Sequence, residues 1–462
     1  MPLNQGFVLR CSITFAPEVD SLSGQFTFVK EIPMSLSKRI LGAVAALSLL
    51  PLPALAAKTA AHWTMNGADT AWVLVATAMV LIMTPGLAFF YGGMVRHKNA
   101  VSTVFQSFIA LGVVGLLWVI IGYSIAFGTG DAYYGGTANF MLKGVGLTGG
   151  ALSIPPMLFM AFQMMFAIIT PALITGAFAE RVRFQSWLLV LVLWSLVVYA
   201  PVAHWVWGPN GMLAVKGTQD FAGGLVVHMT AGFSALVAAI MFGKRRDSGK
   251  PSNTGLIAIG TALLWFGWFG FNAGSALAAN AQAVAAFVNT FVAAAAAMAM
   301  WVLVDHIKDG KPTLIGGCIG IVAGLVAITP AAGYVTAESG IIIGLLAGYF
   351  CNVLARVVKG RYKIDDSLDV FACHGIGGLI GILCVGLFGT KMIGGVDGYF
   401  AGGGNALLAT QATAAVIVAV YSVVATAIIL KVVAAVMPLR VTDGEEKQGI
   451  DASQHGETIC ND

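Results

Sequence analysis

The chain has 462 residues, of which 58% are hydrophobic and only 10% are charged, and its formal net charge is +4. This composition excludes a water-soluble globular protein, because apolar runs longer than about 18 residues, enough to cross a bilayer as a helix, recur along the chain. The aromatic residues lie within these runs, so no nucleic-acid-binding module is indicated. The sequence predicts an all-α polytopic membrane protein.

The N-terminal segment has the features of a targeting signal. Residues 1–33 lack a sustained pattern and are interpreted as a mis-assigned extension. From Met34, the basic pair Lys38 and Arg39, an apolar core and the stretch from Pro53 to Ala56 match the three regions of a secretory signal peptide. Residues 34–56 are therefore predicted to be a signal peptide, with the mature chain starting outside the cytoplasm. An uncleaved transmembrane helix is the alternative, although Pro51 interrupts the short core.

A membrane domain is predicted for residues 66–438. It contains about eleven spans, at residues 71–92, 101–127, 156–180, 184–207, 221–243, 254–276, 282–306, 313–329, 339–358, 369–389 and 408–437. Five spans precede residue 244 and five more end at residue 390. An odd number of spans per half inverts the second half relative to the first, as in many transporters with a site at the membrane midplane. The predicted fold is an inverted 5+5 repeat plus a C-terminal helix.

Basic residues are distributed unevenly between the predicted loops. With the mature N-terminus outside, the cytoplasmic side carries Arg96, Lys98, Arg181, Arg183, Lys244, Arg245, Arg246, Lys250, Lys308, Lys311, Arg356, Lys359, Arg361, Lys363, Arg440 and Lys447. The outer side keeps Lys58, Lys143, Lys216 and Lys391. The positive-inside rule therefore favours an N-terminus outside and residues 439–462 as a cytoplasmic tail. We expect a multi-pass protein of the cell inner (plasma) membrane.

The last predicted span of each half contains one histidine. An ionisable side chain is costly inside a membrane and should face a cavity. His228 follows Asp220, and His374 follows Asp369. On a continuous helix, Asp220 and His228 would share roughly one side and lie about 12 Å apart. A pseudo-two-fold axis would bring the two histidines together. The structural alternative is that each histidine is a hydrogen-bonded core residue between helices.

Aromatic residues and one hydroxyl form a second group of candidates. Phe162 and Phe166 share a helix face, as do Phe271 and Ser275, and Trp207 ends the fourth predicted span. Aromatic faces attract a cation, by about 2 kcal/mol or more when desolvated, and a serine oxygen accepts an N–H, which potassium lacks. Lipid or core packing is the alternative for the phenylalanines, and an interfacial anchor for Trp207.

The six cysteines show no CxxC or metal-ligand spacing, and four lie in apolar segments, where cysteine behaves as a small hydrophobe. They are Cys11, Cys318, Cys351, Cys373, Cys384 and Cys460. We expect no disulfide, metal or cofactor.

Several motifs together resemble those of the Amt/Mep/Rh ammonium transporter family, in its bacterial Amt branch. They are Phe90-Tyr91-Gly92-Gly93, Ala177 to Arg181, Asp220 to His228, Gly267 to Ser275, and Asp365 to Phe371 with His374. The resemblance runs from about residue 66 to the end of the chain. It implies a homotrimer in a lipid bilayer, with ammonium or methylammonium as the substrate of each subunit.

The resemblance also implies roles for the candidate residues. Phe162, Phe166, Trp207 and Ser275 would form the outer ammonium site, Phe166 and Phe271 a stacked gate, and His228 and His374 the pore lining, with Asp220 and Asp369 in support. A PII-type signal protein would bind the cytoplasmic face, and the segments 449–451 and 455–457 resemble the family's tail motif. Two departures are a short loop at residues 243–253, which puts regulation at the inner face in doubt, and Ala372-Cys373 in place of Gly-Val.

These observations lead to the expectation of an ammonium transporter. It would bind ammonium at the outer site, deprotonate it and conduct ammonia past the histidines. A sensor signalling through the tail is one alternative, although only a short tail follows residue 439. An intramembrane metalloenzyme using Asp220, His228 and His374 is another, but the surrounding sequence is glycine and aliphatic. Carbon dioxide conduction is possible by analogy with the Rh branch.

Overall fold

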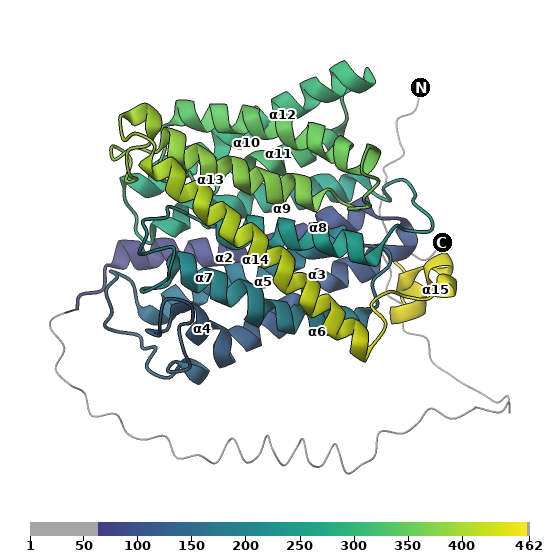
Figure 1. Ribbon diagram of the computed structural model, residues 1–462, viewed down its shortest axis with the longest axis horizontal. Coiled ribbons are helices and arrows are strands. Elements are labelled where there is room, and N and C mark those ends of the chain that lie inside the picture. The colour runs from purple at the N-terminus through teal and green to yellow at the C-terminus, as the bar shows by residue number, and fades with distance from the viewer. Residues whose placement is uncertain (1–62, 460–462) are drawn as a thin grey trace, which may run out of the picture. The chain divides into compact units, whose positions relative to one another are not determined.

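The computed structural model describes residues 63–459 (Figure 1). The predicted N-terminal extension (1–33) and signal peptide (34–56) lie outside the described residues. The described part is helical, and its single β pairing is a bridge between Val182 and Arg440.

The first half contains five membrane segments, several of which are interrupted by π-helical turns. They are α2 (Gly67–Met94); α3 (Ala100–Leu117), η2 (Trp118–Gly122) and α4 (Tyr123–Phe127); α5 (Pro156–Ile174) with η4 (Thr175–Ala177); α6 (Phe184–Trp194), η5 (Ser195–Tyr199) and α7 (Ala200–Trp207); and η6 (Gly224–Met229) with α8 (Thr230–Phe242).

The second half repeats this count and is followed by one long helix. Its segments are α9 (Thr254–Ala273) with η7 (Gly274–Ala276), α10 (Ala281–Asp309), α11 (Leu314–Ile328), α12 (Ala337–Gly360), and η8 (Phe371–Ile376) with α13 (Gly377–Phe388). The last membrane helix is α14 (Ala406–Val436), which crosses the others diagonally in Figure 1. The tail forms α15 (Asp443–Gln448) and η10 (Asp451–His455).

The predicted fold class is confirmed, and each of the eleven predicted spans has a corresponding helix in the described residues. Ten segments are long and apolar enough to cross a membrane, whereas α11 has 15 residues and a length of about 22 Å. Three predicted spans extend two or three residues beyond the observed helix. The third span stops at Ala177, the fifth starts at Gly224 and the tenth starts at Phe371, because glycine or positive-φ residues occupy the flanking loops.

Corresponding helices of the two halves pack against each other. α2 lies along α9, and η6 and α8 contact η8 and α13. Glycines permit these close crossings: a Cβ on Gly260 would collide with the backbone nitrogen of Phe90, and a Cβ on Gly232 with the backbone of Gly375. Gly375 follows His374, so this second crossing brings the last segments of the two halves together beside the histidines.

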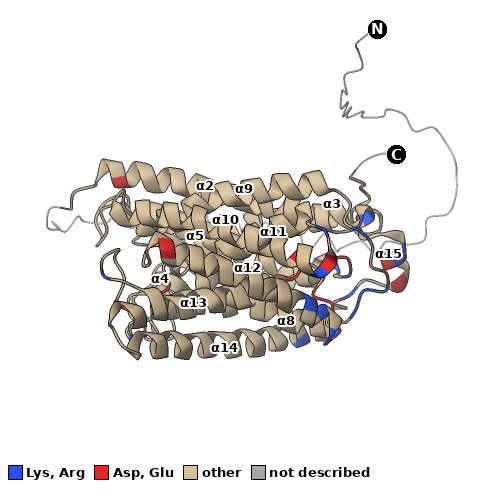
Figure 2. Ribbon diagram, turned by 90° about the horizontal axis from the view of Figure 1, so that it is seen from above, with Lys and Arg blue, Asp and Glu red and all other residues tan. Residues whose placement is uncertain are grey.

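The two ends of the helix bundle differ in charge. Figure 2 shows Lys and Arg gathered at the end that carries α15, which we call the tail end. The opposite end, which contains the start of α14 and the cavity described below, is called the vestibule end.

Candidate functional site

A cavity of about 430 Å³ opens at the vestibule end. Phe166, Trp207, Asp220 and Ser275 line it. Phe162 does not line it, but lies buried behind Phe166 with the two ring centroids 4.9 Å apart in an edge-to-face arrangement. Four of the residues singled out in the sequence are therefore at this cavity, and Phe162 supports one of them.

Hydrogen bonds orient the polar groups of the vestibule. The Trp207 indole N–H donates to the Asp220 carbonyl oxygen at 2.8 Å, which ties the end of α7 to the segment before η6. The Ser275 hydroxyl donates to the Phe271 carbonyl oxygen at 2.8 Å. Because its proton is committed to that bond, the serine oxygen faces the cavity as a hydrogen-bond acceptor.

The prediction that Asp220 and His228 share one side of a continuous helix is wrong, because Asp220 lies before the helix of His228. The π-helical turn η6 begins at Gly224, after Gly223 with a φ of +122°. The Asp220 carboxylate instead accepts four backbone N–H groups, from Gly223, Gly224, Leu225 and Val226, at 2.6–3.2 Å. Free N–H groups at a helix start favour a carboxylate there, so Asp220 holds the beginning of the His228 segment.

Two phenylalanine rings close the inner end of the vestibule. The centroids of Phe166 and Phe271 are 4.2 Å apart, with 36° between the ring planes. Both rings are almost fully buried. Phe271 also lies 5.9 Å from the His228 ring, so that it separates the vestibule from the histidines. An ion or molecule passing between them would have to displace these rings.

The two histidines meet directly below the phenylalanines. Their Nδ1 atoms are 3.2 Å apart, and both side chains are buried. They line a cavity of about 10 Å³ with Phe271, Trp268 and aliphatic side chains. Nε2 of His228 has no hydrogen-bond partner among the described residues. This differs from the buried His204, whose two ring nitrogens each contact a backbone carbonyl oxygen.

Sequence reasoning did not single out Trp268 or Gln163. The Trp268 ring stacks on His228 at 5.4 Å, and its N–H donates to Thr329 Oγ1. Trp268 lies three residues before Phe271 on the same helix, so the sequence could have indicated that both side chains share one face. Gln163 lines the vestibule beside Phe166, and its buried Oε1 has no partner in the described chain. A polar residue within a long apolar run was the signal for that position.

The residue of the second half that caps its histidine segment as Asp220 does is Asp366, whereas Asp369, which was predicted to support the site, lies three residues later. Asp366 precedes His374 by the same eight residues that separate Asp220 from His228, and its Oδ2 accepts the Phe371 N–H at 2.8 Å. Burial, followed by the nearby Asp369 charge, raises the pKa of Asp366 to about 6. Asp369 has a φ of +59° and forms an ion pair with Lys359 at 2.8 Å instead.

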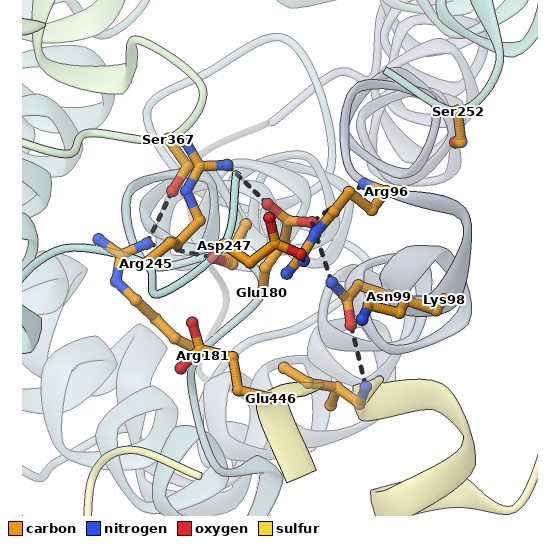
Figure 3. A network of polar contacts seen from close by, with 12 residues as sticks. Arg96, Lys98, Asn99, Glu180, Arg181, Arg245, Asp247, Ser252, Ser367 and Glu446 are labelled. Atoms are coloured by element: carbon orange, nitrogen blue, oxygen red, sulfur yellow. Dashed lines mark hydrogen bonds and ion pairs between the residues drawn. The ribbon is translucent and has the colours of Figure 1, made fainter. Parts of the chain in front are cut away.

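A buried carboxylate organises the tail end. Glu180 accepts hydrogen bonds from Arg96 at 2.7 Å, Asn99 at 2.9 Å and Arg245 at 2.6 Å (Figure 3). Burial raises the pKa of Glu180, but these hydrogen bonds and the Arg245 charge outweigh it and lower the pKa overall. Arg245 also pairs with Asp365 at 2.9 Å, next to Asp366. The network therefore links the start of α3 to the segment before His374.

The tail joins this network through Asn99. The amide N–H of Ile450 donates to Asn99 Oδ1 at 2.9 Å. The Asp451 carboxylate accepts the backbone N–H groups of Val101 and Ser102 at 2.9 and 2.8 Å, where α3 begins. The His455 ring then packs edge-on against two phenylalanine rings. The residues of the predicted tail motif thus hold the tail against α3.

Four cysteines fall in the described residues, and all are buried and free: Cys318, Cys351, Cys373 and Cys384. Cys373 belongs to a small apolar cluster with Cys351 and Trp301, one residue before His374. Across residues 63–459, no three His, Cys, Asp or Glu side chains are grouped so that they could hold a metal ion.

Comparisons with known proteins agree on one family. The sequence profile of the Ammonium Transporter Family matches residues 71–459. An ammonium transporter of Bacillus subtilis is 47% identical over 404 residues, which cover 86% of this chain and all of that protein. The crystal structure of Candida albicans Mep2 matches with a TM-score of 0.77 and 37% identity, over 83% of this chain and 88% of that one. A sensor Amt protein matches with a TM-score of 0.78 and 30% identity, over 84% and 98% of the two chains.

Proposed function

The chain belongs to the ammonium transporter family and is a multi-pass membrane transporter of ammonium rather than an enzyme. We propose that it captures NH4+ in the vestibule and conducts ammonia past the paired histidines. The proposal rests on the order of three compartments along one path. A cation-compatible vestibule, a phenylalanine gate and a narrow histidine-lined cavity follow one another.

The vestibule suits ammonium better than potassium. The Ser275 oxygen is available as an acceptor, and ammonium has N–H groups to donate, whereas potassium has none. The faces and edges of Trp207 and Phe166 border the same space, and aromatic faces attract a desolvated cation. Asp220 adds a negative charge without an ion-pair partner in the described residues. We assign Phe166, Trp207 and Ser275 to ammonium binding, with Phe162 positioning Phe166.

The inner cavity favours a neutral molecule. Its volume of about 10 Å³ has room for roughly one water-sized molecule, and its walls are aromatic and aliphatic apart from the histidines. A bare cation in such surroundings costs several kcal/mol or more. Loss of a proton at or just below the vestibule avoids that cost, so ammonia is the species we propose to cross.

The histidine pair offers hydrogen bonds without a fixed charge. With Nδ1 atoms 3.2 Å apart, one ring donates an N–H and the other accepts it. In a neutral pair the two Nε2 atoms then differ, because one carries a proton and the other a lone pair. Ammonia can use either. We therefore assign His228 and His374 to the lining of the conduction path.

The test is ammonium-evoked charge movement in proteoliposomes, with potassium as the comparison and a pH-sensitive dye inside the vesicles. His228→Ala is expected to abolish the ammonium flux or to let potassium pass. Cys373→Val is the matched control, because it changes a buried neighbour of His374 that the path does not use, and it should keep flux and selectivity. Unchanged flux and selectivity in His228→Ala would refute the assigned role.

The same assay separates the possible forms of transport. A saturable ammonium current means that charge crosses, whereas a pH change without current means conduction of neutral ammonia. If wild-type vesicles show neither signal beyond protein-free vesicles, the transport proposal fails and a sensing role is favoured.

Ser275→Leu tests the vestibule separately. Removing one hydrogen bond to a charged group should weaken the apparent ammonium affinity by about tenfold or more, while maximal flux falls less. An unaltered concentration dependence would refute the binding site.

The remaining expectations on location and partners are part of this proposal. The gathering of Lys and Arg at the tail end supports a cytoplasmic tail and an outward vestibule in the inner membrane (Figure 2). We also propose a homotrimer, a cleaved signal peptide, and a PII-type signal protein that contacts the tail end. Cross-linking in membranes and N-terminal sequencing of the mature protein test the first two, and co-purification tests the third.

A further inference from the structure

The end of α11 lies inside the helix bundle, close to the residues that surround His228. α11 starts after the exposed loop at residues 310–313 and has 15 residues, so it is about 22 Å long, whereas the hydrocarbon core is about 30 Å thick. Thr329 and Pro330 follow its last residue, and both are buried. A helix end at membrane depth is tolerated where protein encloses its backbone. The fold therefore places a fixed turn beside the conduction path.

Thr329 holds the indole of Trp268 in place. The Trp268 N–H donates to the Thr329 hydroxyl oxygen at 2.8 Å, and the hydroxyl donates in turn to the Leu325 carbonyl oxygen at 2.7 Å. Trp268 is 2% exposed and Thr329 is fully buried, so water cannot easily replace either partner. Because a buried N–H without an acceptor is costly, this hydrogen bond fixes the direction of the indole.

The indole in turn sets the plane of the His228 ring. The Trp268 and His228 ring planes are 23° apart, and the Phe271 ring lies at a similar angle of 22° to His228. Nε2 of His228 has no partner among the described residues, whereas both ring nitrogens of the buried His204 contact carbonyl oxygens. Aromatic stacking, together with the contact to His374, therefore sets the orientation of His228.

The residue after Thr329 contacts the start of the His228 segment. The Pro330 carbonyl oxygen accepts the Phe221 N–H at 3.1 Å. The Pro330 ring packs so closely on Gly224, the first residue of η6, that a Cβ on that glycine would collide with it. The end of α11 thus touches the beginning of the His228 segment as well as the indole stacked on His228.

We propose that Thr329 is a positioning residue for ammonium conduction, which acts by holding Trp268 against His228. Thr329 lines neither the vestibule nor the histidine cavity, so its effect passes through the indole. With the indole held, His228 keeps the orientation that places its Nδ1 atom 3.2 Å from that of His374. This inference rests on the proposed function, because it assigns a further residue to the same conduction path.

Thr329→Val tests the inference, because valine has nearly the shape of threonine but no hydroxyl. The maximal ammonium flux in proteoliposomes should fall about fivefold, the factor expected for the loss of one hydrogen bond. The apparent affinity for ammonium should stay unchanged, because the vestibule is not altered. Thr329→Ser keeps the acceptor oxygen and should restore the wild-type flux. If Thr329 served only to fill space, valine would be tolerated and serine would be harmful.

Trp268→Phe tests whether the effect passes through the indole. This variant removes the indole N–H and should itself lower the flux. Adding Thr329→Val to Trp268→Phe should cause no further loss, because the hydrogen bond is already absent. A further fivefold loss in the double variant would overturn the proposed route from Thr329 to His228.

Thr426→Val is the matched control. Thr426 is buried and accepts the N–H of Trp194 at 3.0 Å, so the variant removes a hydrogen bond of the same kind. Neither residue lines the vestibule or the histidine cavity, so flux and affinity should stay at the wild-type level. An equal loss of flux in Thr329→Val and Thr426→Val would overturn the proposal. Wild-type flux in Thr329→Val, or no recovery in Thr329→Ser, would do so as well.

The outcomes also distinguish this inference from the proposed function. If His228→Ala leaves the ammonium flux unchanged, the conduction path itself is wrong and the role of Thr329 fails with it. If His228→Ala abolishes the flux and Thr329→Val transports ammonium as the wild type does, only the role of Thr329 is refuted.

Discussion

Asp220→Asn is expected to destabilise the protein strongly, although it changes one atom of the side chain. The two carboxylate oxygens accept two backbone N–H groups each, Oδ1 from Gly223 and Gly224 and Oδ2 from Leu225 and Val226. Asparagine has one oxygen and one NH2 group. It can keep two of the four hydrogen bonds, and its NH2 group then faces the other two N–H donors.

The cost follows from those two donors. A buried N–H group that loses its acceptor costs about 1–3 kcal/mol, so the substitution should cost about 2–6 kcal/mol. Asp220 lines the vestibule but is only 6% exposed, so water has little access to the N–H groups that lose their acceptor. The damage is local to the start of the His228 segment and to the vestibule wall. We expect a lower unfolding temperature together with a weaker apparent affinity for ammonium.

Thermal unfolding of the purified protein in detergent, followed by tryptophan fluorescence, measures the first effect. Asp366→Asn is the matched control, because it makes the same change at the equivalent position of the other half. Asp366 accepts one N–H, from Phe371, on Oδ2, and its Oδ1 has no partner in the described chain. Asparagine can keep that bond. If Asp220→Asn unfolds at the wild-type temperature, or no lower than Asp366→Asn, the capping argument is wrong.

Three further predictions use the same transport and unfolding assays. Because the pKa of Asp366 is raised to about 6 in the folded state, its contribution to stability is present below pH 4 and is lost as the pH rises through 6. Wild type should therefore lose more stability between pH 5 and pH 7.5 than Asp366→Asn does. An equal loss in the two proteins would contradict this. Gly232→Ala should reduce ammonium flux, because its Cβ would collide with Gly375 and separate the histidines. Gly317→Ala is the control and should keep the flux, because the nearest atom to its Cβ is 3.5 Å away. Equal flux in both variants would contradict the claim that the close crossing at Gly232 positions the histidines. Asp451→Ala leaves two N–H groups of α3 without an acceptor and so removes a contact that holds the tail. Limited proteolysis should therefore cut the tail faster than in wild type. An unchanged rate would show that other contacts hold the tail.

The membrane helices were predictable because bilayer thickness imposes a length and composition on every span. Even α11, which is short at 15 residues, fell within its predicted range of 313–329. The meeting of His228 and His374 was also predictable, because an odd number of spans per half inverts the repeat and brings equivalent positions to the centre. These predictions depend on constraints that act along the whole chain.

The local geometry at the ends of segments was not predictable in the same way. Periodicity assumes a regular helix, and the π-helical turn starting at Gly224 breaks that assumption for Asp220. The prediction named Asp369 as the aspartate near His374 and did not consider Asp366. In the structure the Phe371 N–H of η8 donates to Asp366. The family resemblance assigned Phe162 to the outer site, and its spacing to Phe166 indicated a shared helix face. A shared face does not say which ring is nearer the cavity.

The inverted repeat gives each end of the pore one capping carboxylate, but the surroundings make the two chemically different. Asp220 lines an open cavity and has hydrogen bonds but no ion-pair partner in the described part of the chain, so its charge acts on whatever enters the vestibule. Burial raises the pKa of both carboxyls, so the two differ in their surroundings: Asp366 is buried beside Asp369 and Lys359 and does not line the vestibule. A cation is therefore attracted at the vestibule end and less so at the tail end. This asymmetry within a symmetric backbone supports the proposed direction, with capture of ammonium at the vestibule and release of ammonia at the end held by the tail.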